Sequence, residues 1–123
     1  MDLGVIGEGE ATFGEIVARA VDGRGLSGIQ GTVRRKEGTP AAEERRPPIE
    51  PIDGIDFPAH HLLTGKPYFY QYPVRSSSRR YLAVVASRGC PFDCTFCTKT
   101  AVWGRGVRWR SVRNVLQELK EIQ

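Results

Sequence analysis

Short apolar segments alternate along this chain with polar segments rich in glycine, proline and charge. Residues 3–6 form an apolar run that ends at Gly7-Glu8-Gly9-Glu10. Beyond this turn, apolar residues recur at helical spacing up to Asp22-Gly23, namely Phe13, Ile16, Val17, Ala20 and Val21. A strand, a glycine turn and a helix in this order are the building unit of a parallel α/β sheet. The pattern therefore predicts an α/β class.

The middle of the chain changes character. Residues 28–35 have the composition of a second strand, and Lys36-Glu37-Gly38 predicts a turn after it. Residues 39–52 then contain four prolines and a run of charges at 43–46. Proline lacks a backbone N–H, so this stretch is incompatible with an ordinary helix or a central strand. We expect an extended linker with a solvated, charged surface.

Residues 81–86 form a continuous apolar run, which predicts a parallel strand buried on both faces. Near the end of the chain, Ser111 is a suitable N-cap for a helix. One apolar face follows it, formed by Val112, Val115, Leu116, Leu119 and Ile122.

All three cysteines lie within the eight residues that begin at Cys90 and end at Cys97, in the spacing C-x3-C-x2-C around Cys94. An odd, crowded set argues against a disulfide framework. Zinc usually takes a fourth ligand from paired Cys or His spacings, whereas His60 and His61 lie far upstream. Three thiolates without an obvious fourth suit a cubane iron–sulfur cluster in which one iron stays open.

Three other groups of side chains are better explained by structure than by ligand binding. Residues adjacent on a chain point apart, so His60 and His61 favour packing or a helix start over a shared metal. The aromatic residues between Pro67 and Pro73 favour packing over base stacking. The arginines at 105, 108, 110 and 113 are best explained by bonds that close a loop.

Charge and thiols bear on location and partners. A net charge of +4 and a pI near 9.2 are too weak to imply nucleic acid without a focused patch. The first twenty residues contain four carboxylates and no long apolar run, so we expect no signal peptide, no membrane span and no membrane partner. Thiols reserved for a cluster favour a reducing, cytoplasmic setting.

The run Ser-Arg-Gly-Cys-Pro-Phe-Asp-Cys-Thr-Phe-Cys at 87–97 resembles the cluster loop of the radical S-adenosylmethionine (SAM) enzymes, in the branch whose barrel follows a cobalamin-binding domain. The resemblance implies that Cys90, Cys94 and Cys97 bind three irons of a 4Fe–4S cluster. The fourth iron would chelate the amino and carboxylate groups of SAM. Phe96 would lie near the adenine.

The resemblance extends beyond the cysteines. The Gly-Glu-Gly-Glu turn and its helix are similar to the last strand-to-helix turn of the cobalamin domain, where Gly7 and Gly9 would let the backbone approach the cofactor's nucleotide tail. It implies three parts. Residues 1–38 would be the C-terminal remnant of a flavodoxin-like cobalamin-binding domain, 39–78 a proline-rich linker, and 79–123 the first βα unit of a truncated (β/α) barrel.

The implied activity is reductive cleavage of SAM to start radical chemistry on an unknown small-molecule or peptide substrate, with an electron donor such as flavodoxin or ferredoxin. We expect the isolated fragment to be inactive. A methylthiotransferase is one alternative, although residues 98–105 lack the P-x-x-R-G segment usual there. A zinc-stabilised nucleic-acid-binding module is another, although it lacks a fourth ligand of the right spacing.

Overall fold

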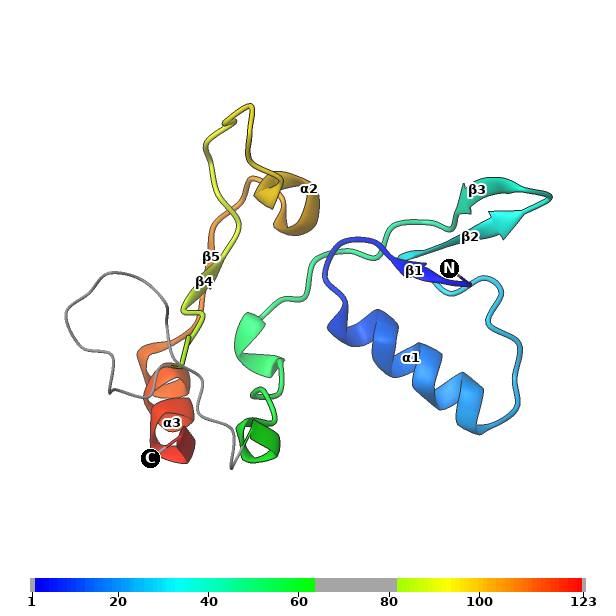
Figure 1. Cartoon of the computed structure of the whole chain (residues 1–123). Coiled ribbons are helices and arrows are strands. Elements are labelled where there is room, and N and C mark those ends of the chain that lie inside the picture. Colours follow the sequence, from blue (N-terminus) through cyan, green and yellow to red (C-terminus); the bar gives the residue numbers. More distant parts are fainter. Residues whose placement is uncertain (1, 64–81, 123) are drawn as a thin grey trace.

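A computed structural model of the chain describes residues 2–63 and 82–122. Its elements are β1 (Gly4–Val5), α1 (Glu10–Val21), β2 (Thr32–Lys36), β3 (Thr39–Ala42), the 3-10 turns η1 (Ile52–Gly54) and η2 (His60–Leu63), β4 (Ser87–Arg88), α2 (Lys99–Trp103), β5 (Arg108–Trp109) and α3 (Val112–Ile122). Strands β1, β2 and β3 form one sheet in that order, and β4 pairs with β5 in a second. Figure 1 shows α1 against the first sheet and α3 near the base of the β4–β5 ribbon. The mixed α/β class is confirmed.

The hairpin between β2 and β3 confirms the predicted turn. Glu37 and Gly38 have φ angles of 52° and 82°, and this left-handed pair suits a two-residue hairpin turn. The strand predicted at 28–35 begins later, at Thr32.

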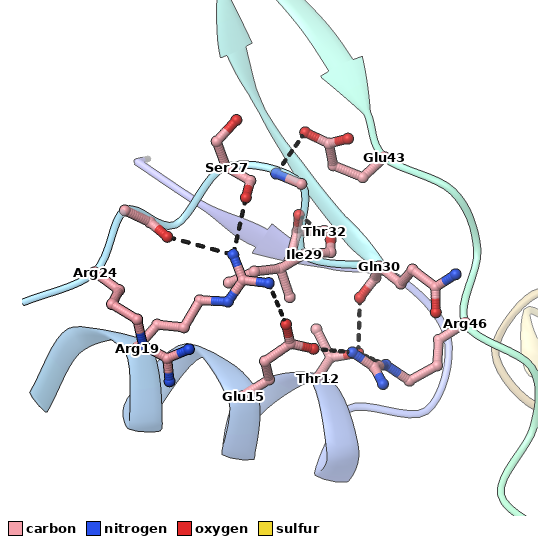
Figure 2. Close-up of polar contacts among 12 residues, drawn as sticks. Thr12, Glu15, Arg19, Arg24, Ser27, Ile29, Gln30, Thr32, Glu43 and Arg46 are labelled. Carbon is pink, nitrogen blue, oxygen red and sulfur yellow. Dashed lines mark hydrogen bonds and ion pairs between the residues drawn. The ribbon is translucent and has the colours of Figure 1, made fainter. Parts of the chain in front are cut away.

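Helix α1 is confirmed, and a largely polar network joins it to the following segments (Figure 2). The Thr12 hydroxyl is fully buried; it donates to the Gln30 carbonyl at 3.2 Å and accepts from Arg46 Nε at 3.1 Å. The Glu15 carboxylate accepts from both Arg19, at 2.6 Å, and Arg46. The predicted apolar side of the helix is largely exposed, since Phe13, Val17 and Val21 are 63%, 45% and 81% accessible.

The expected parallel pairing is wrong for the described strands. Strand β1 pairs antiparallel with β2, β2 pairs antiparallel with β3, and β4 pairs antiparallel with β5. Apolar patterning locates a strand but does not fix its direction, which depends on how the connection returns. Here a tight hairpin joins β2 to β3, and the cysteine loop folds β5 back along β4.

Two further expectations are corrected. The described part of the run at 81–86 is not a strand, and Leu82 and Val85 are 37% and 48% exposed. A buried parallel strand needs hydrogen-bonded neighbours on both sides, and within the described residues the strand pairing here begins only at Ser87. The expected linker also begins with a strand, β3, where Pro40 sits opposite Arg35. Strand β3 is at the edge of its sheet, which is where proline is tolerated.

Across residues 2–63 and 82–122, no helix combines the length and apolar character needed to cross a membrane.

Candidate metal centre

The three cysteines lie on the loop of residues 89–107, which leaves β4 and returns to β5. We call the paired strands β4 and β5 the stem of this loop. In the stem, Ser87 faces Trp109 and Arg88 faces Arg108. Above it, the Cys90 amide donates to the Gly104 carbonyl at 3.3 Å, and the Cys97 amide donates to the Cys94 carbonyl at 3.0 Å. Figure 1 shows the loop, with α2 inside it, reaching away from α3.

All three thiols are free; Cys94 is exposed, and Cys90 and Cys97 are half-buried. Within the described residues, no three Cys, His, Asp or Glu side chains form a ready-made metal-binding group. The donor set fits a soft metal centre, because it consists of three unpaired thiols on one accessible loop. The three thiols lie on the same loop, but the loop would have to change conformation to bring them close enough to bind one cluster.

Gly89 fixes the close approach of the two sides of this loop. Its φ is +90°, in the left-handed region, and a Cβ at this position would lie 1.9 Å from the Gly106 carbonyl oxygen. That separation is far inside van der Waals contact. A glycine immediately before Cys90 is therefore required by the backbone itself.

Glu8, from the glycine turn before α1, binds the stem. Its carboxylate accepts from Arg108 through both terminal nitrogens, at 2.5 and 3.1 Å, and from the Ile49 amide at 2.6 Å. Arg88 lies 3.5 Å from the same carboxylate. Burial raises the pKa of Glu8, but the hydrogen bonds from Arg108 and Ile49 and the two arginine charges outweigh it, so the net pKa is lowered.

Glu10 adds a second carboxylate to this contact. It accepts from Arg88 at 2.5 Å, and that hydrogen bond is the main reason for its lowered pKa. Within the loop, Arg105 pairs with Asp93 at 2.7 Å, with both side chains largely exposed. The prediction that these arginines close a loop is confirmed for Arg105 and Arg108.

A second polar cluster joins η2 to α3. Glu118 is 1% exposed; it contacts His60 Nε2 at 3.0 Å and accepts a hydrogen bond from Arg110. Arg110 also donates to the Val85 carbonyl at 2.9 Å and lies 5.3 Å from the centre of the Phe57 ring. His60 therefore packs between segments, as expected from the sequence. A cavity of about 60 Å³ lies beside this cluster, lined in part by Phe57, Val85 and Glu118.

The N-cap prediction for α3 is confirmed, because the Ser111 hydroxyl accepts from the Asn114 amide at 3.1 Å. The Ser111 amide in turn donates to Asp53 at 2.8 Å. Hydrogen bonds from the Ser111 hydroxyl and then from this amide lower the pKa of the Asp53 carboxyl. Asp53, in η1, thus fixes the start of α3.

The remaining predicted site residues occupy different surroundings. Phe96 is 88% exposed on the loop. Gly7 has a φ of +81°, and a Cβ there would lie 3.8 Å from the Val102 carbonyl of α2, so this turn lies beside the cysteine loop. Gly9 has an ordinary φ of −86° as the N-cap of α1. The aromatic cluster between Pro67 and Pro73 falls outside the described residues.

Sequence reasoning missed the contacts of Glu8, which it treated only as part of the glycine turn before the helix. The available signal was an excess of arginines beside the cysteine loop, which require carboxylates. Nothing local indicated that those carboxylates come from the opposite end of the chain.

Several known proteins are similar in sequence to this chain. No family model matches the chain. The chain is 37% identical over 119 residues to an uncharacterized methyltransferase of Pyrococcus horikoshii, and the aligned region covers 97% of this chain and 25% of that protein. It is 32% identical to the cytidylyl-2-hydroxyethylphosphonate methyltransferase of Streptomyces wedmorensis, covering 100% of this chain and 28% of that protein. The anaerobic magnesium-protoporphyrin IX monomethyl ester cyclase of Rubrivivax gelatinosus is 31% identical, over 98% of this chain and 21% of the cyclase.

Among solved structures, the chain resembles TsrM of Kitasatospora setae, a radical SAM methyltransferase solved with cobalamin and a 4Fe–4S cluster bound. The TM-score is 0.61 at 21% identity, over 98% of this chain and 24% of TsrM. The resemblance drawn from residues 87–97 is confirmed: the chain is similar to methyltransferases and a cyclase, and its fold is similar to that of a radical SAM enzyme that contains cobalamin. It spans about a quarter of the length of the relatives it matches.

Proposed function

We propose that this chain supplies the cluster loop of a cobalamin-dependent radical SAM methyltransferase. Cys90, Cys94 and Cys97 would bind three irons of a 4Fe–4S cluster and leave the fourth open for SAM. The single observation that carries the proposal is the set of three free thiols on one accessible loop whose base is closed by the stem. When bound, such a cluster supplies an electron for the reductive cleavage of SAM.

The chain's own residues would present the thiols and orient the cofactor. Gly89 lets the two sides of the loop approach at its base, and the stem arginines hold that base against Glu8 and Glu10. Phe96, exposed beside Cys97, would pack against the adenine of SAM. An aromatic ring offers an apolar face for this contact without adding a charge near the thiols.

The cobalamin part of the proposal is supported by position. The turn that contains Gly7 and Gly9 lies beside α2 of the cysteine loop, so a cofactor that approached this turn would be near the cluster loop. Methyl transfer is favoured because two of the relatives described above are methyltransferases by name. Residues 1–38 would belong to the cobalamin domain, 39–78 to the linker and 79–123 to the barrel.

The partners and location we propose follow from the same chemistry. A small-molecule or peptide substrate would meet parts of the enzyme beyond these residues, and a flavodoxin or ferredoxin would supply the electron. A reducing, cytoplasmic setting would keep the three thiols available for iron.

Anaerobic reconstitution with iron and sulfide tests the cluster. We expect brown visible absorption, about four irons per chain, and a change in the electron paramagnetic resonance spectrum of the reduced sample when SAM is added. A chain that binds zinc but takes up no iron and sulfide would contradict the proposal. Hydroxocobalamin titration of a longer product of the same gene tests the cobalamin part separately.

A further inference from the structure

We propose that Glu8 is a positioning residue for the cysteine loop, because its carboxylate holds both strands of the stem in place. The inference rests on the proposed function, since it gives the loop the task of presenting three thiols to a cluster. Glu8 belongs to the glycine turn before α1, and no resemblance or motif assigns it a role.

Two arginines of the stem repel each other, and the carboxylate of Glu8 offsets this repulsion. Arg88 and Arg108 are directly opposite each other in the antiparallel register. Like charges at opposed positions destabilise a strand pair, and an isolated two-stranded ribbon is only marginally stable in water. The Glu8 carboxylate contacts both guanidinium groups, at 3.5 Å for Arg88 and 2.5 Å for Arg108. It therefore converts a repulsive pair into a bridged one.

The bridge is buried, which increases its effect. The side chains of Glu8, Arg108 and Arg88 are 4%, 11% and 17% exposed. A buried carboxylate that accepts several donors is costly to remove, because its partners are left without a counter-charge. Arg108 also donates to the Ile49 carbonyl at 2.7 Å, while the Ile49 amide donates to Glu8. The linker is thus part of the same contact.

The bridge lies at the point where the loop begins. Arg88 is followed by Gly89 and then by Cys90, so the direction in which the chain enters the loop is set at a residue that Glu8 and Glu10 hold. The far side of the loop contacts the same turn, where Gly7 lies near the Val102 carbonyl. One turn therefore supports the loop at its base and at α2.

The test compares Glu8→Gln with a matched control in the full chain. Gln keeps the shape of the side chain and removes its charge. Glu15 is a suitable control because its carboxylate is also shared by two arginines, Arg19 and Arg46 (Figure 2), neither of which is a residue of the stem. Two properties are measured in each protein. The first is amide hydrogen exchange in the iron-free chain at Cys90 and Arg110, whose amides donate to the Gly104 and Ala86 carbonyls on either side of the stem. The second is the iron concentration that gives half-maximal cluster absorbance.

In Glu8→Gln we expect faster exchange at both amides and an iron requirement raised about tenfold, the size typical of residues that orient metal ligands. Glu15→Gln should leave both properties at the wild-type level. Adding Arg108→Gln to Glu8→Gln should recover part of the lost protection, because one of the two opposed charges is gone. General loss of folding would not be rescued in this way.

Unchanged exchange at Cys90 and Arg110 in Glu8→Gln would overturn the inference while the proposed function stood. Equal effects of Glu8→Gln and Glu15→Gln would also overturn it, since the contact would then be no more than general packing. A wild-type chain that binds no iron would remove the proposed function, and with it the task assigned to Glu8.

Discussion

The carboxylate of Glu8 lies 2.5 Å from the guanidinium of Arg108, one hundred residues further along the chain. This contact joins the turn before α1 to the strand that closes the cysteine loop. The cysteine loop is therefore held at its base by a residue that is far from every cysteine in the sequence but close to the loop in space.

The carboxylates at the stem predict a dependence on pH. The pKa values of Glu8 and Glu10 are lowered in the folded chain from the ordinary value of 4.5. Each therefore contributes stability that is fully present above about pH 4.5 and is lost as the pH falls through the folded pKa. The Trp103 carbonyl accepts from Arg108 at 3.4 Å, and Trp109 directly follows Arg108 in β5, so fluorescence of the iron-free chain should report the opening of this contact in acid. The transition should weaken in the Glu8→Gln/Glu10→Gln double variant, and an identical transition there would contradict the assignment.

Gly89→Ala should destabilise the stem. The new methyl group would meet the Gly106 carbonyl, and φ would remain in the left-handed region, at a cost on the order of 2 kcal/mol. Gly106→Ala is the matched control, because a Cβ there meets nothing within 4 Å. We expect weaker iron binding and faster exchange at the Cys90 amide only in Gly89→Ala. Similar behaviour of the two variants would show that the loop does not need the close approach.

Replacing any of Cys90, Cys94 or Cys97 by Ala should remove most cluster binding, because the chain contains no other thiol that could substitute. Iron and sulfide per chain after anaerobic reconstitution provide the measurement. Thr95→Ala, between two of the cysteines, controls for disturbance of the loop and should load normally. Iron content near wild type in Cys94→Ala would contradict the ligand assignment.

Glu118→Ala should release α3 from η2. Its carboxylate is buried between His60 and Arg110, so its loss leaves Arg110 without its buried counter-charge, at a cost of about 3 kcal/mol. Glu121→Ala changes an exposed carboxylate on the same helix and should have little effect. Amide exchange along α3 distinguishes the two variants. Equal protection in both would show that the contacts of Glu118 with His60 and Arg110 do not stabilise the fold.

The sequence predicted those features that depend on neighbouring residues. The cysteine spacing, the turn at Glu37-Gly38 and the Ser111 cap are all local, since each is set by a few adjacent side chains or φ angles. Helix α1 was visible from its apolar spacing. The proposed class of chemistry follows from the resemblance of residues 87–97 alone.

The features it failed to predict depend on distant partners. Antiparallel pairing of β1 with β2 is set by where the chain returns after α1, which apolar patterning does not encode. Residues 81–86 have strand composition, but composition does not supply a hydrogen-bonding neighbour. In the sequence Glu8 is one of four carboxylates near the N-terminus, whereas in the structure its carboxylate is bound by Arg108.

The bridge at Glu8 has a consequence for recombination between homologous genes. The proline-rich stretch at 39–52 looks like a natural crossover point, because its composition separates two apolar regions. A crossover there would take residue 8 from one parent and residues 88 and 108 from the other. If the two parents carry different combinations of charges at residues 8, 88 and 108, the chimera would have mismatched charges at the stem. The turn before α1 and the cysteine loop are therefore expected to be inherited together, although residues 11–88 lie between them.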